Sequence, residues 1–345
     1  MGKRCLCLTE NREWQLLAFF LCHVKEKFLM SCIDACYKFD RRDIYFVKGV
    51  FVARPIFYIR IFTVERRMTM KIKLFATDLD GTLLTSDDKI SPKNIQAMRD
   101  AVNAGVMVTL ATGRMYSSAV QYARQIDIDV PLITYNGALI KATSGRVYNE
   151  KYIKQSVVKE IVAYCAQKQW YLQVNSNDAL YFPVYLERSA AYEKSTGIKG
   201  ETVGWQGLGQ KNENVAKMLL VTEDYGKKDG TEKIQEENEM LYELTQKFAG
   251  KVMLVKSKKG LIEIVNPEVS KANALHILAG RFGFSIEEVM AIGDADNDLP
   301  MLEAAGKSVA MGNAAANIKA ACDYVVGTND DDGVAEAIYK YVLNK

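Results

Sequence analysis

The sequence predicts an α/β protein built around a parallel β-sheet, and two observations lead to this prediction. Short apolar runs alternate with amphipathic segments, both in residues 70–151 and in residues 263–345. Almost every apolar run ends in a polar cluster rich in Asp, Asn, Gly and Thr. Strands that alternate with helices favour parallel pairing with helices on both faces. We therefore expect a Rossmann-like core.

The first half of this core is expected to run strand, helix, strand, helix, strand. Ser91 and Pro92 suit the N-cap and the first turn of a helix. The last strand is followed by the turn Asn136-Gly137. The predicted strands are 71–77, 106–111 and 132–135, and the predicted helices are 91–103 and about 116–126.

The second half repeats the pattern after a helix at 271–282. Ligands bind to open parallel sheets outside the carboxyl ends of the strands, so the polar clusters of distant loops are expected to meet at one edge. The remaining predicted elements are strands at 289–292, 308–311 and 324–326 and helices at about 299–305, 315–320 and 333–343.

Residues 152–262 interrupt the alternation and are expected to form an inserted α/β cap domain. The core would then be discontinuous, consisting of residues 70–151 and 263–345. Two apolar runs pair naturally as a hairpin across Lys258-Lys259-Gly260. The predicted helices are 157–168 and 233–248, and the predicted strands are 170–174, 180–182, 215–222, 252–256 and 261–265.

Residues 1–67 differ from the rest of the chain. They hold 13 basic and 7 acidic side chains and five of the seven cysteines, although the whole chain has a net charge of only +3. Their apolar runs are too short or too charged to cross a membrane, and they lack the paired C-x2-C spacing of zinc sites. We hypothesise that translation starts at Met68 or Met70, and that residues 1–69 are an N-terminal extension outside the fold.

Composition also limits the partners and the compartment. With 49% hydrophobic and 25% charged residues the chain is globular, and its balanced charge argues for neither a nucleic-acid partner nor a membrane partner. The two cysteines beyond the first segment, Cys165 and Cys322, follow no pattern. This favours a reducing compartment, and we expect a cytoplasmic protein.

Acidic residues at two strand ends suggest a site for a divalent cation. Asp78 and Asp80 lie two residues apart after one strand, and Gly81 permits a turn there. Further acidic residues follow another strand, while Lys271 and the pair Thr112-Gly113 offer an ammonium, a hydroxyl and free amides. Hard oxygen ligands suit Mg²⁺, and the cation and amides suit phosphoryl oxygens.

Simpler interpretations exist for each of these motifs. A single Asp-x-Asp-Gly occurs in ordinary loops, and Lys271 alone would suit a solvated helix end. The run Asp294-Ala-Asp-Asn-Asp298 superficially resembles a calcium loop. Leu299 occupies the glycine position of such a loop and Ala305 its terminal glutamate position, so the calcium interpretation fails. The joint occurrence of the motifs after successive strands favours a single site.

Taken together, these motifs resemble the haloacid dehalogenase-like hydrolases, and within them the Cof-type phosphatases. The resemblance covers about residues 70–345. The residues that carry it are Asp78-Leu-Asp-Gly-Thr82, Ala111-Thr-Gly-Arg114, Ser270-Lys271 and Gly293-Asp-Ala-Asp-Asn-Asp298, together with Asn136-Gly-Ala138, Ala310-Met-Gly-Asn-Ala314 and Asn329-Asp-Asp-Asp-Gly-Val-Ala335.

The resemblance implies roles for individual residues. Asp78 would be the nucleophile that forms an aspartyl-phosphate. Asp80 would protonate the leaving oxygen and then deprotonate the attacking water. Thr112, Gly113 and Lys271 would hold the phosphoryl group.

The resemblance also implies a Mg²⁺ cofactor. The ligands would be the carboxylate of Asp78, the backbone carbonyl of Asp80 and Asp294. Asn297 or Asp298 would bind the ion directly or contact it through an oriented water molecule. A cation is physically reasonable here, since an anionic nucleophile must approach an anionic phosphate.

The leading hypothesis is a Mg²⁺-dependent phosphatase that acts on small phosphorylated metabolites such as sugar phosphates, nucleotides or phosphorylated cofactors. Two alternatives stay open. A phosphomutase would transfer the phosphate between positions of a sugar, and a phospholigand sensor would bind without turnover. The sequence identifies neither the physiological ester nor the oligomeric state.

Overall fold

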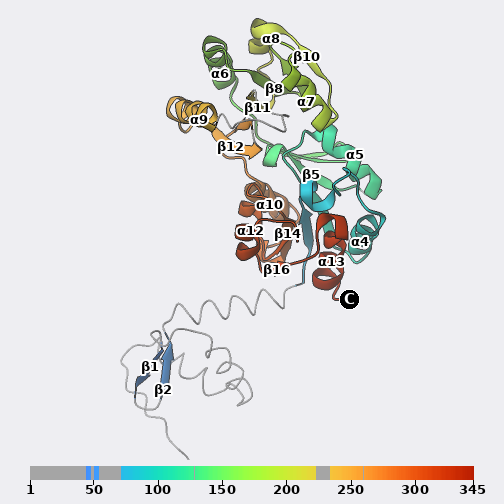
Figure 1. Cartoon of the computed structure of the whole chain (residues 1–345). Coiled ribbons are helices and arrows are strands. Elements are labelled where there is room, and N and C mark those ends of the chain that lie inside the picture. Colours follow the sequence, from blue (N-terminus) through green and yellow to red (C-terminus); the bar gives the residue numbers. More distant parts are fainter. Residues whose placement is uncertain (1–43, 48–49, 54–70, 128, 223–233, 259) are drawn as a thin grey trace, which may run out of the picture. The chain divides into compact units, whose positions relative to one another are not determined.

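The computed structural model describes residues 44–47, 50–53, 71–127, 129–222, 234–258 and 260–345 (Figure 1). The chain divides into two compact units, 1–68 and 69–345. In the first unit, β1 (Ile44–Val47) and β2 (Val50–Ala53) pair antiparallel. The hypothesis of a start at Met68 or Met70 lies outside the described residues and stays a prediction.

An eight-stranded sheet forms the core of the second unit, in the order β16-β15-β14-β3-β4-β5-β6-β7. The pairs from β16 to β5 are parallel, and β6 and β7 extend the edge antiparallel. The strands are β3 (Leu74–Thr77), β4 (Met107–Ala111), β5 (Pro131–Thr134), β6 (Leu139–Ala142), β7 (Val147–Glu150), β14 (Val289–Gly293), β15 (Lys307–Ala310) and β16 (Tyr324–Val325).

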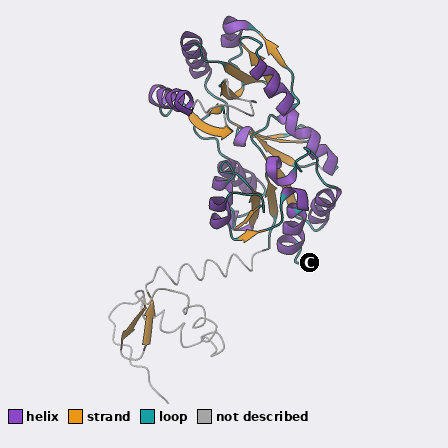
Figure 2. Cartoon of the chain, in the orientation of Figure 1, coloured by secondary structure: helices purple, strands orange, loops and turns teal. Residues whose placement is uncertain are grey.

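Helices cover both faces of this sheet, because its buried strands carry apolar side chains on both sides (Figure 2). In β3, Phe75 packs on one face while Leu74 and Ala76 pack on the other. The first face is covered by α4 (Pro92–Asn103), α5 (Tyr116–Ile126) and α13 (Gly333–Ala337), and the second by α10 (Lys271–Arg281), α11 (Leu299–Ala304) and α12 (Ala316–Ala321). The predicted α/β class with a parallel core is confirmed.

A second sheet of six strands, in the order β10-β9-β8-β11-β13-β12, lies between the two halves of the core sequence. We call this sheet and its helices the cap. The cap elements are α6 (Gln155–Lys168), β8 (Leu172–Ser176), β9 (Ala179–Phe182), α7 (Glu187–Thr196), β10 (Gly200–Thr202), α8 (Gly204–Gln210), β11 (Val215–Val221), α9 (Ile234–Phe248), β12 (Met253–Lys258) and β13 (Leu261–Val265).

The two faces of the cap sheet have different neighbours. One face packs against α6, α8 and α9 in a separate hydrophobic cluster. Side chains of the opposite face, including Leu180, Leu219 and Leu261, belong to the same cluster as core residues such as Tyr135 and Met115. The cap sheet therefore rests on the core. Its strand β13 ends at Val265, three residues beyond the boundary at 262 expected from the sequence.

Several elements differ from the sequence expectations. The hairpin β6–β7, the helices α7 and α8 and the strand β10 were not predicted. The last predicted helix, 333–343, is α-helical only to Ala337 and continues as a short π-helix over Ile338–Val342. The short helical turns are η2 (Leu79–Leu83), η3 (Tyr135–Gly137), η4 (Ile286–Glu288), η5 (Asn329–Asp331) and η6 (Ile338–Val342).

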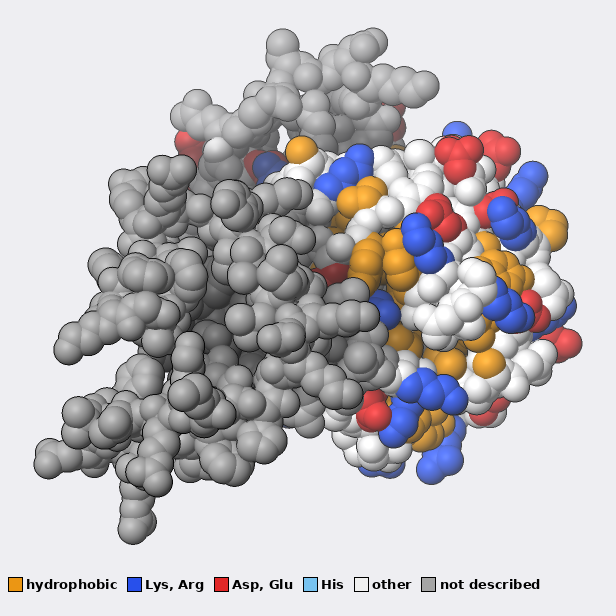
Figure 3. Space-filling view, turned by 90° about the horizontal axis from the view of Figure 1, so that it is seen from below, with side chains coloured by type: hydrophobic (Ala, Val, Ile, Leu, Met, Phe, Trp, Pro, Cys, Tyr) orange, Lys and Arg blue, Asp and Glu red, His pale blue; other side chains and the backbone are white. Residues whose placement is uncertain are grey.

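The surface of the described residues agrees with the balanced composition. On the face shown in Figure 3, basic and acidic side chains are interspersed. In the described part of the chain, no helix combines the length and the apolar character needed to cross a membrane.

The contact between α4 and α13 gives a test of the core packing. Asn94 of α4 is fully buried, and its Oδ1 accepts a hydrogen bond from the backbone N–H of Ala335, 2.9 Å away. We expect Asn94→Ala to lower the free energy of unfolding by about 1–3 kcal/mol, because that N–H loses its partner and a cavity replaces the buried side chain, which together outweigh the removal of the unpaired Nδ2 of Asn94. Urea unfolding followed by circular dichroism measures the change.

A matched control comes from the same helix. Gln96 is exposed and bonds to Asp100 one turn away. Gln96→Ala should change the free energy of unfolding by no more than about 0.5 kcal/mol. Equal losses of unfolding free energy in the two variants would show that Asn94 does not stabilise the contact between α4 and α13.

Candidate functional site

Asp78 lies at the carboxyl end of β3, in the middle of the core sheet. Its neighbours in the sheet are β14 and β4, so the loops after all three strands meet at this edge. The Asp78 N–H donates to the carbonyl of Ile292 in β14, which fixes the strand end. The side chain is buried, and burial together with the nearby Asp298 carboxylate raises the pKa of Asp78 well above its usual value.

Lys271 connects this strand end to another loop. Its Nζ lies 2.6 Å from Asp78 Oδ1 and 2.5 Å from Asp298 Oδ1, and its side chain is fully buried. The residue is the first of α10, whose N-cap Ser270 accepts a hydrogen bond from the Asn273 N–H. Burial lowers the pKa of Lys271, but the two carboxylates raise it by more, so the ammonium stays charged.

Asp298 and Asp294 complete an acidic cluster at the end of β14. Asp298 Oδ2 accepts from the backbone N–H groups of Asp294 and Ala295, at 3.1 Å each. One carboxylate oxygen from each of Asp78, Asp294 and Asp298 lies within 4.8 Å of the others. Burial raises the pKa of Asp294 to about 6.

The formal charge of this cluster favours a divalent cation. The three carboxylates carry −3 and Lys271 carries +1, which leaves −2 in a largely buried space. Uncompensated charge is costly away from water. Three hard oxygen ligands at this separation fit a hard cation such as Mg²⁺.

The turn after β3 brings the acidic loops close together. Gly81 has φ +78°, and a Cβ at this position would lie 2.5 Å from Asp294 Oδ2. Glycine is therefore required both by the backbone conformation and by the approach of the carboxylate. The next residue, Thr82, donates from Oγ1 to Asp294 Oδ1 at 2.7 Å.

Asp80 is held apart from the cluster by an arginine. The Nε and Nη2 atoms of Arg114 bond to the two oxygens of Asp80 at 2.9 and 2.7 Å. Nη1 of Arg114 bonds to the Tyr122 hydroxyl, and the guanidinium lies over the Tyr122 ring. This bidentate pair fixes the orientation of a half-exposed carboxylate beside the cluster.

Thr112 and Gly113 follow β4 and form the neighbouring loop. Thr112 is buried, and its Oγ1 accepts from the Arg114 N–H at 3.1 Å. The carbonyl of Gly113 accepts from Lys217 Nζ of the cap at 2.9 Å. The loop therefore contacts the core arginine and a cap lysine.

A buried polar bridge connects this loop to the cap sheet. Lys217 Nζ also lies 3.2 Å from Glu263 Oε1, and both side chains are less than a tenth exposed. Glu263 Oε2 accepts from Asn136 Nδ2 of the core at 2.8 Å. The cap thus reaches the core through one cation and one anion that neutralise each other.

The structure thus brings four of the predicted site residues into one cluster: Asp78, Lys271, Asp294 and Asp298. Asp80 joins Arg114 beside it. Asn297 lies half-buried in the turn before Asp298, and no hydrogen bond between described residues connects its side chain to the cluster. Its expected part in metal binding stays a prediction, as does that of the Asp80 carbonyl.

Sequence reasoning missed the partners that orient these groups. Arg114 stood beside the predicted Thr112-Gly113 pair, and its place in that motif was the available signal. Lys217 and Glu263 gave a weaker one, as charged residues inside the apolar strands β11 and β13. The sequence alone does not show which residue each of these three side chains contacts.

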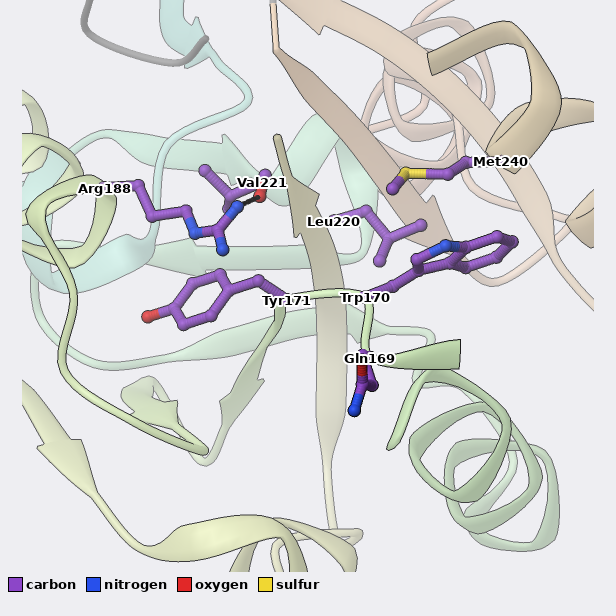
Figure 4. A pocket seen from close by; sticks show the side chains of 7 residues that line it. All are labelled: Gln169, Trp170, Tyr171, Arg188, Leu220, Val221 and Met240. Carbon is purple, nitrogen blue, oxygen red and sulfur yellow. Dashed lines mark hydrogen bonds between the residues drawn. The ribbon is translucent and has the colours of Figure 1, made fainter. Parts of the chain in front are cut away.

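A small pocket in the cap is separate from this cluster. It measures about 70 Å³ and is lined by cap residues alone. Figure 4 shows Arg188 beside Tyr171, with a bond to the carbonyl of Val221 that measures 3.1 Å. None of the predicted site residues lines the pocket.

Comparisons with known proteins show the family of the chain. The family model of haloacid dehalogenase-like hydrolases matches residues 75–338. The 5-amino-6-(5-phospho-D-ribitylamino)uracil phosphatase YwtE of Bacillus subtilis is 33% identical over 287 residues, covering 76% of this chain and 96% of YwtE. The phosphatase YwpJ of the same organism is 33% identical over 287 residues, covering 79% of this chain and 100% of YwpJ.

A solved structure shares the fold as well. A haloacid dehalogenase-like hydrolase from Bacteroides thetaiotaomicron superposes with a TM-score of 0.70 at 30% identity, covering 78% of this chain and 99% of that protein. The chain therefore belongs to the haloacid dehalogenase-like hydrolases, in the Cof-type phosphatase family, and is a phosphoric monoester hydrolase.

Proposed function

We propose that the chain is a Mg²⁺-dependent phosphatase that hydrolyses small phosphate esters through an aspartyl-phosphate on Asp78. The observation that carries this proposal is the cluster of Asp78, Asp294 and Asp298 around Lys271, with its net charge of −2. Asp78, Asp294 and Asp298 would hold the ion, with the Asp80 carbonyl and Asn297 as further candidates. When bound, Mg²⁺ neutralises charge on the nucleophile and on the phosphate.

In the proposed first step the Asp78 carboxylate attacks phosphorus, and the bond to the ester oxygen breaks. Asp80 gives its proton to the leaving oxygen, so the alcohol departs neutral. In the second step Asp80 takes a proton from water, whose oxygen attacks the aspartyl-phosphate. Phosphate leaves and Asp78 is restored as a carboxylate. Thr112, the Gly113 loop and Lys271 hold the phosphoryl oxygens during both steps.

The substrate is expected to be a small metabolite. Two relatives from Bacillus subtilis are named as phosphatases of 5-amino-6-(5-phospho-D-ribitylamino)uracil, and a solved neighbour of 26% identity is titled a sugar phosphatase. We include such esters in the proposed substrate class. Both cysteines of the described residues are free, which supports the proposed cytoplasmic location.

The nucleophile is tested by Asp78→Asn. We expect phosphate release from a panel of small esters to fall by about 10⁴-fold or more, because the amide cannot form the covalent intermediate. The variant should still fold and should gain thermal stability without metal, because it removes a buried carboxylate whose pKa is raised. Phosphate assays and thermal unfolding measure the two effects.

The control for this variant is Asp296→Asn, an exposed residue of the same acidic motif that bonds to Asn317. Its activity should stay within about threefold of the native enzyme. Reaction in ¹⁸O-labelled water should place the label in the released phosphate. Absence of the label would favour the phosphomutase, and absence of turnover with every ester would favour the sensor.

The pH dependence of metal binding follows from Asp294. With a pKa of about 6 in the metal-free site, this carboxyl is deprotonated at pH 7.5 and largely protonated at pH 5. Mg²⁺ binds the deprotonated form, so protonation of Asp294 should lower its affinity by up to about tenfold per pH unit below about 6, and protonation of Asp78, whose pKa is also raised, should lower it further. Calorimetric titration at pH 5, 6 and 7.5 measures this. Equal affinity at all three values would contradict Asp294 as a ligand.

Arg114 is expected to position Asp80. We expect Arg114→Gln to lower kcat for an alkyl phosphate by about 10–100-fold, because Asp80 loses both charge-assisted hydrogen bonds. The decrease in kcat with p-nitrophenyl phosphate should be smaller, since its leaving group needs little protonation. Arg124→Gln, at an exposed position of α5, is the control. Equal losses with both esters would argue for a merely structural Arg114.

A further inference from the structure

Buried polar atoms without hydrogen-bond partners gather where the cap meets the core. Both amide atoms of Asn175 and both of Gln173 lack a partner, and both side chains are fully buried. Asn136 Oδ1 and Ser117 Oγ of the core are in the same condition. Each such group costs about 1–3 kcal/mol in a folded protein, so a concentration of them requires an explanation.

The strand register places the two cap amides on the face that touches the core. Asn175 of β8 lies opposite Lys217 of β11, and opposite residues of an antiparallel pair share a face. Lys217 reaches the Gly113 carbonyl, so this face looks onto the predicted phosphate-binding loop.

Gln173 continues the same face one row further. It lies opposite Leu219, which in turn lies opposite Glu263 of β13. Glu263 bonds to Asn136 of the core. The two amides therefore border the polar bridge between cap and core.

The charge of this face restricts what it can bind. Lys217 and Glu263 neutralise each other at 3.2 Å, and the amides of Asn175 and Gln173 carry no charge. A second phosphate or a carboxylate would find no uncompensated cation in this group of four side chains. An amide offers a donor and an acceptor side by side, which suits an uncharged partner with the same pair.

We propose that Asn175 and Gln173 determine specificity by binding the leaving group of the phosphate ester. The group they take is uncharged and carries adjacent hydrogen-bond donors and acceptors, as the hydroxyls of a polyol or the edge of a ureide ring do. This inference rests on the proposed phosphatase function. Because both side chains are buried, an ester reaches them when cap and core separate, and its leaving group then supplies their missing partners.

Selectivity between matched esters tests the inference. The probes are three phosphate esters. The leaving group of ribitol 5-phosphate offers hydroxyls, that of 3-(uracil-1-yl)propyl phosphate offers a ureide ring, and that of n-pentyl phosphate offers neither. The native enzyme should prefer at least one of the first two to pentyl phosphate, because an apolar leaving group leaves the amides unpaired. In Asn175→Leu, kcat/KM for the preferred ester should fall about 10–100-fold, with less than about threefold change for pentyl phosphate.

The same variant has a stability readout. Leucine has the same number and branching of side-chain heavy atoms as asparagine and removes two unpaired buried polar atoms, so the Tm of the substrate-free protein should rise by about 2–4 °C. Asn149→Leu is the matched control. It replaces another asparagine whose Nδ2 has no partner, on strand β7 of the core, and should leave the selectivity ratio unchanged.

The outcomes separate this inference from the proposed function. If the native enzyme hydrolyses the esters and Asn175→Leu lowers kcat/KM for all three equally, or for none, the specificity role is wrong and the phosphatase stands. If the native enzyme hydrolyses none of these esters or the wider panel, the proposed function fails and this inference fails with it.

Discussion

The site depends on one buried ammonium shared by two carboxylates. Lys271 is fully buried and contacts Asp78 and Asp298, which lie in the loops that follow strands β3 and β14. A lysine without a counter-charge would lose its proton in such a place, and two carboxylates without a cation would repel each other. The central pairing of β3 with β14, the start of α10 and the amides of the Asp294 turn all serve to hold these three groups together.

Lys271 compensates one of the three negative charges in this cluster and leaves two uncompensated. Asp298 is satisfied by Lys271 and by two backbone N–H groups. Asp78 and Asp294 both have raised pKa values, since burial affects them and the ammonium is shared. The protein thus places its least stabilised carboxylates where a cation and a phosphate would meet. Such local cost at a functional site is expected when binding energy offsets it.

Much of the core could be predicted from sequence, because buried parallel strands are continuous apolar runs that end in polar loops. The strands 71–77 and 106–111 and the helix from Ser91 are examples. The hairpin β6–β7 could not, since its strands are four residues long and half of β7 is exposed. Helix α7 has no apolar stripe, its buried residues being Ser189, Tyr192 and Glu193, and α8 contains three glycines. In both helices tertiary contacts outweigh local preference.

In the site, the reactive residues could be predicted from the sequence, but the residues that contact them could not. The residues that carry charge and hydroxyls were predictable, because short motifs after successive strands converge at one sheet edge. Their partners were not, because a sequence does not say that Lys217 meets Gly113 or that Asn136 meets Glu263, more than 100 positions away in each case. These pairings require the cap sheet to rest on the core in a definite register. Short sequence motifs of the core thus carry the residues proposed for the reaction, whereas the proposed choice of substrate depends on a contact between two sheets that only the fold creates.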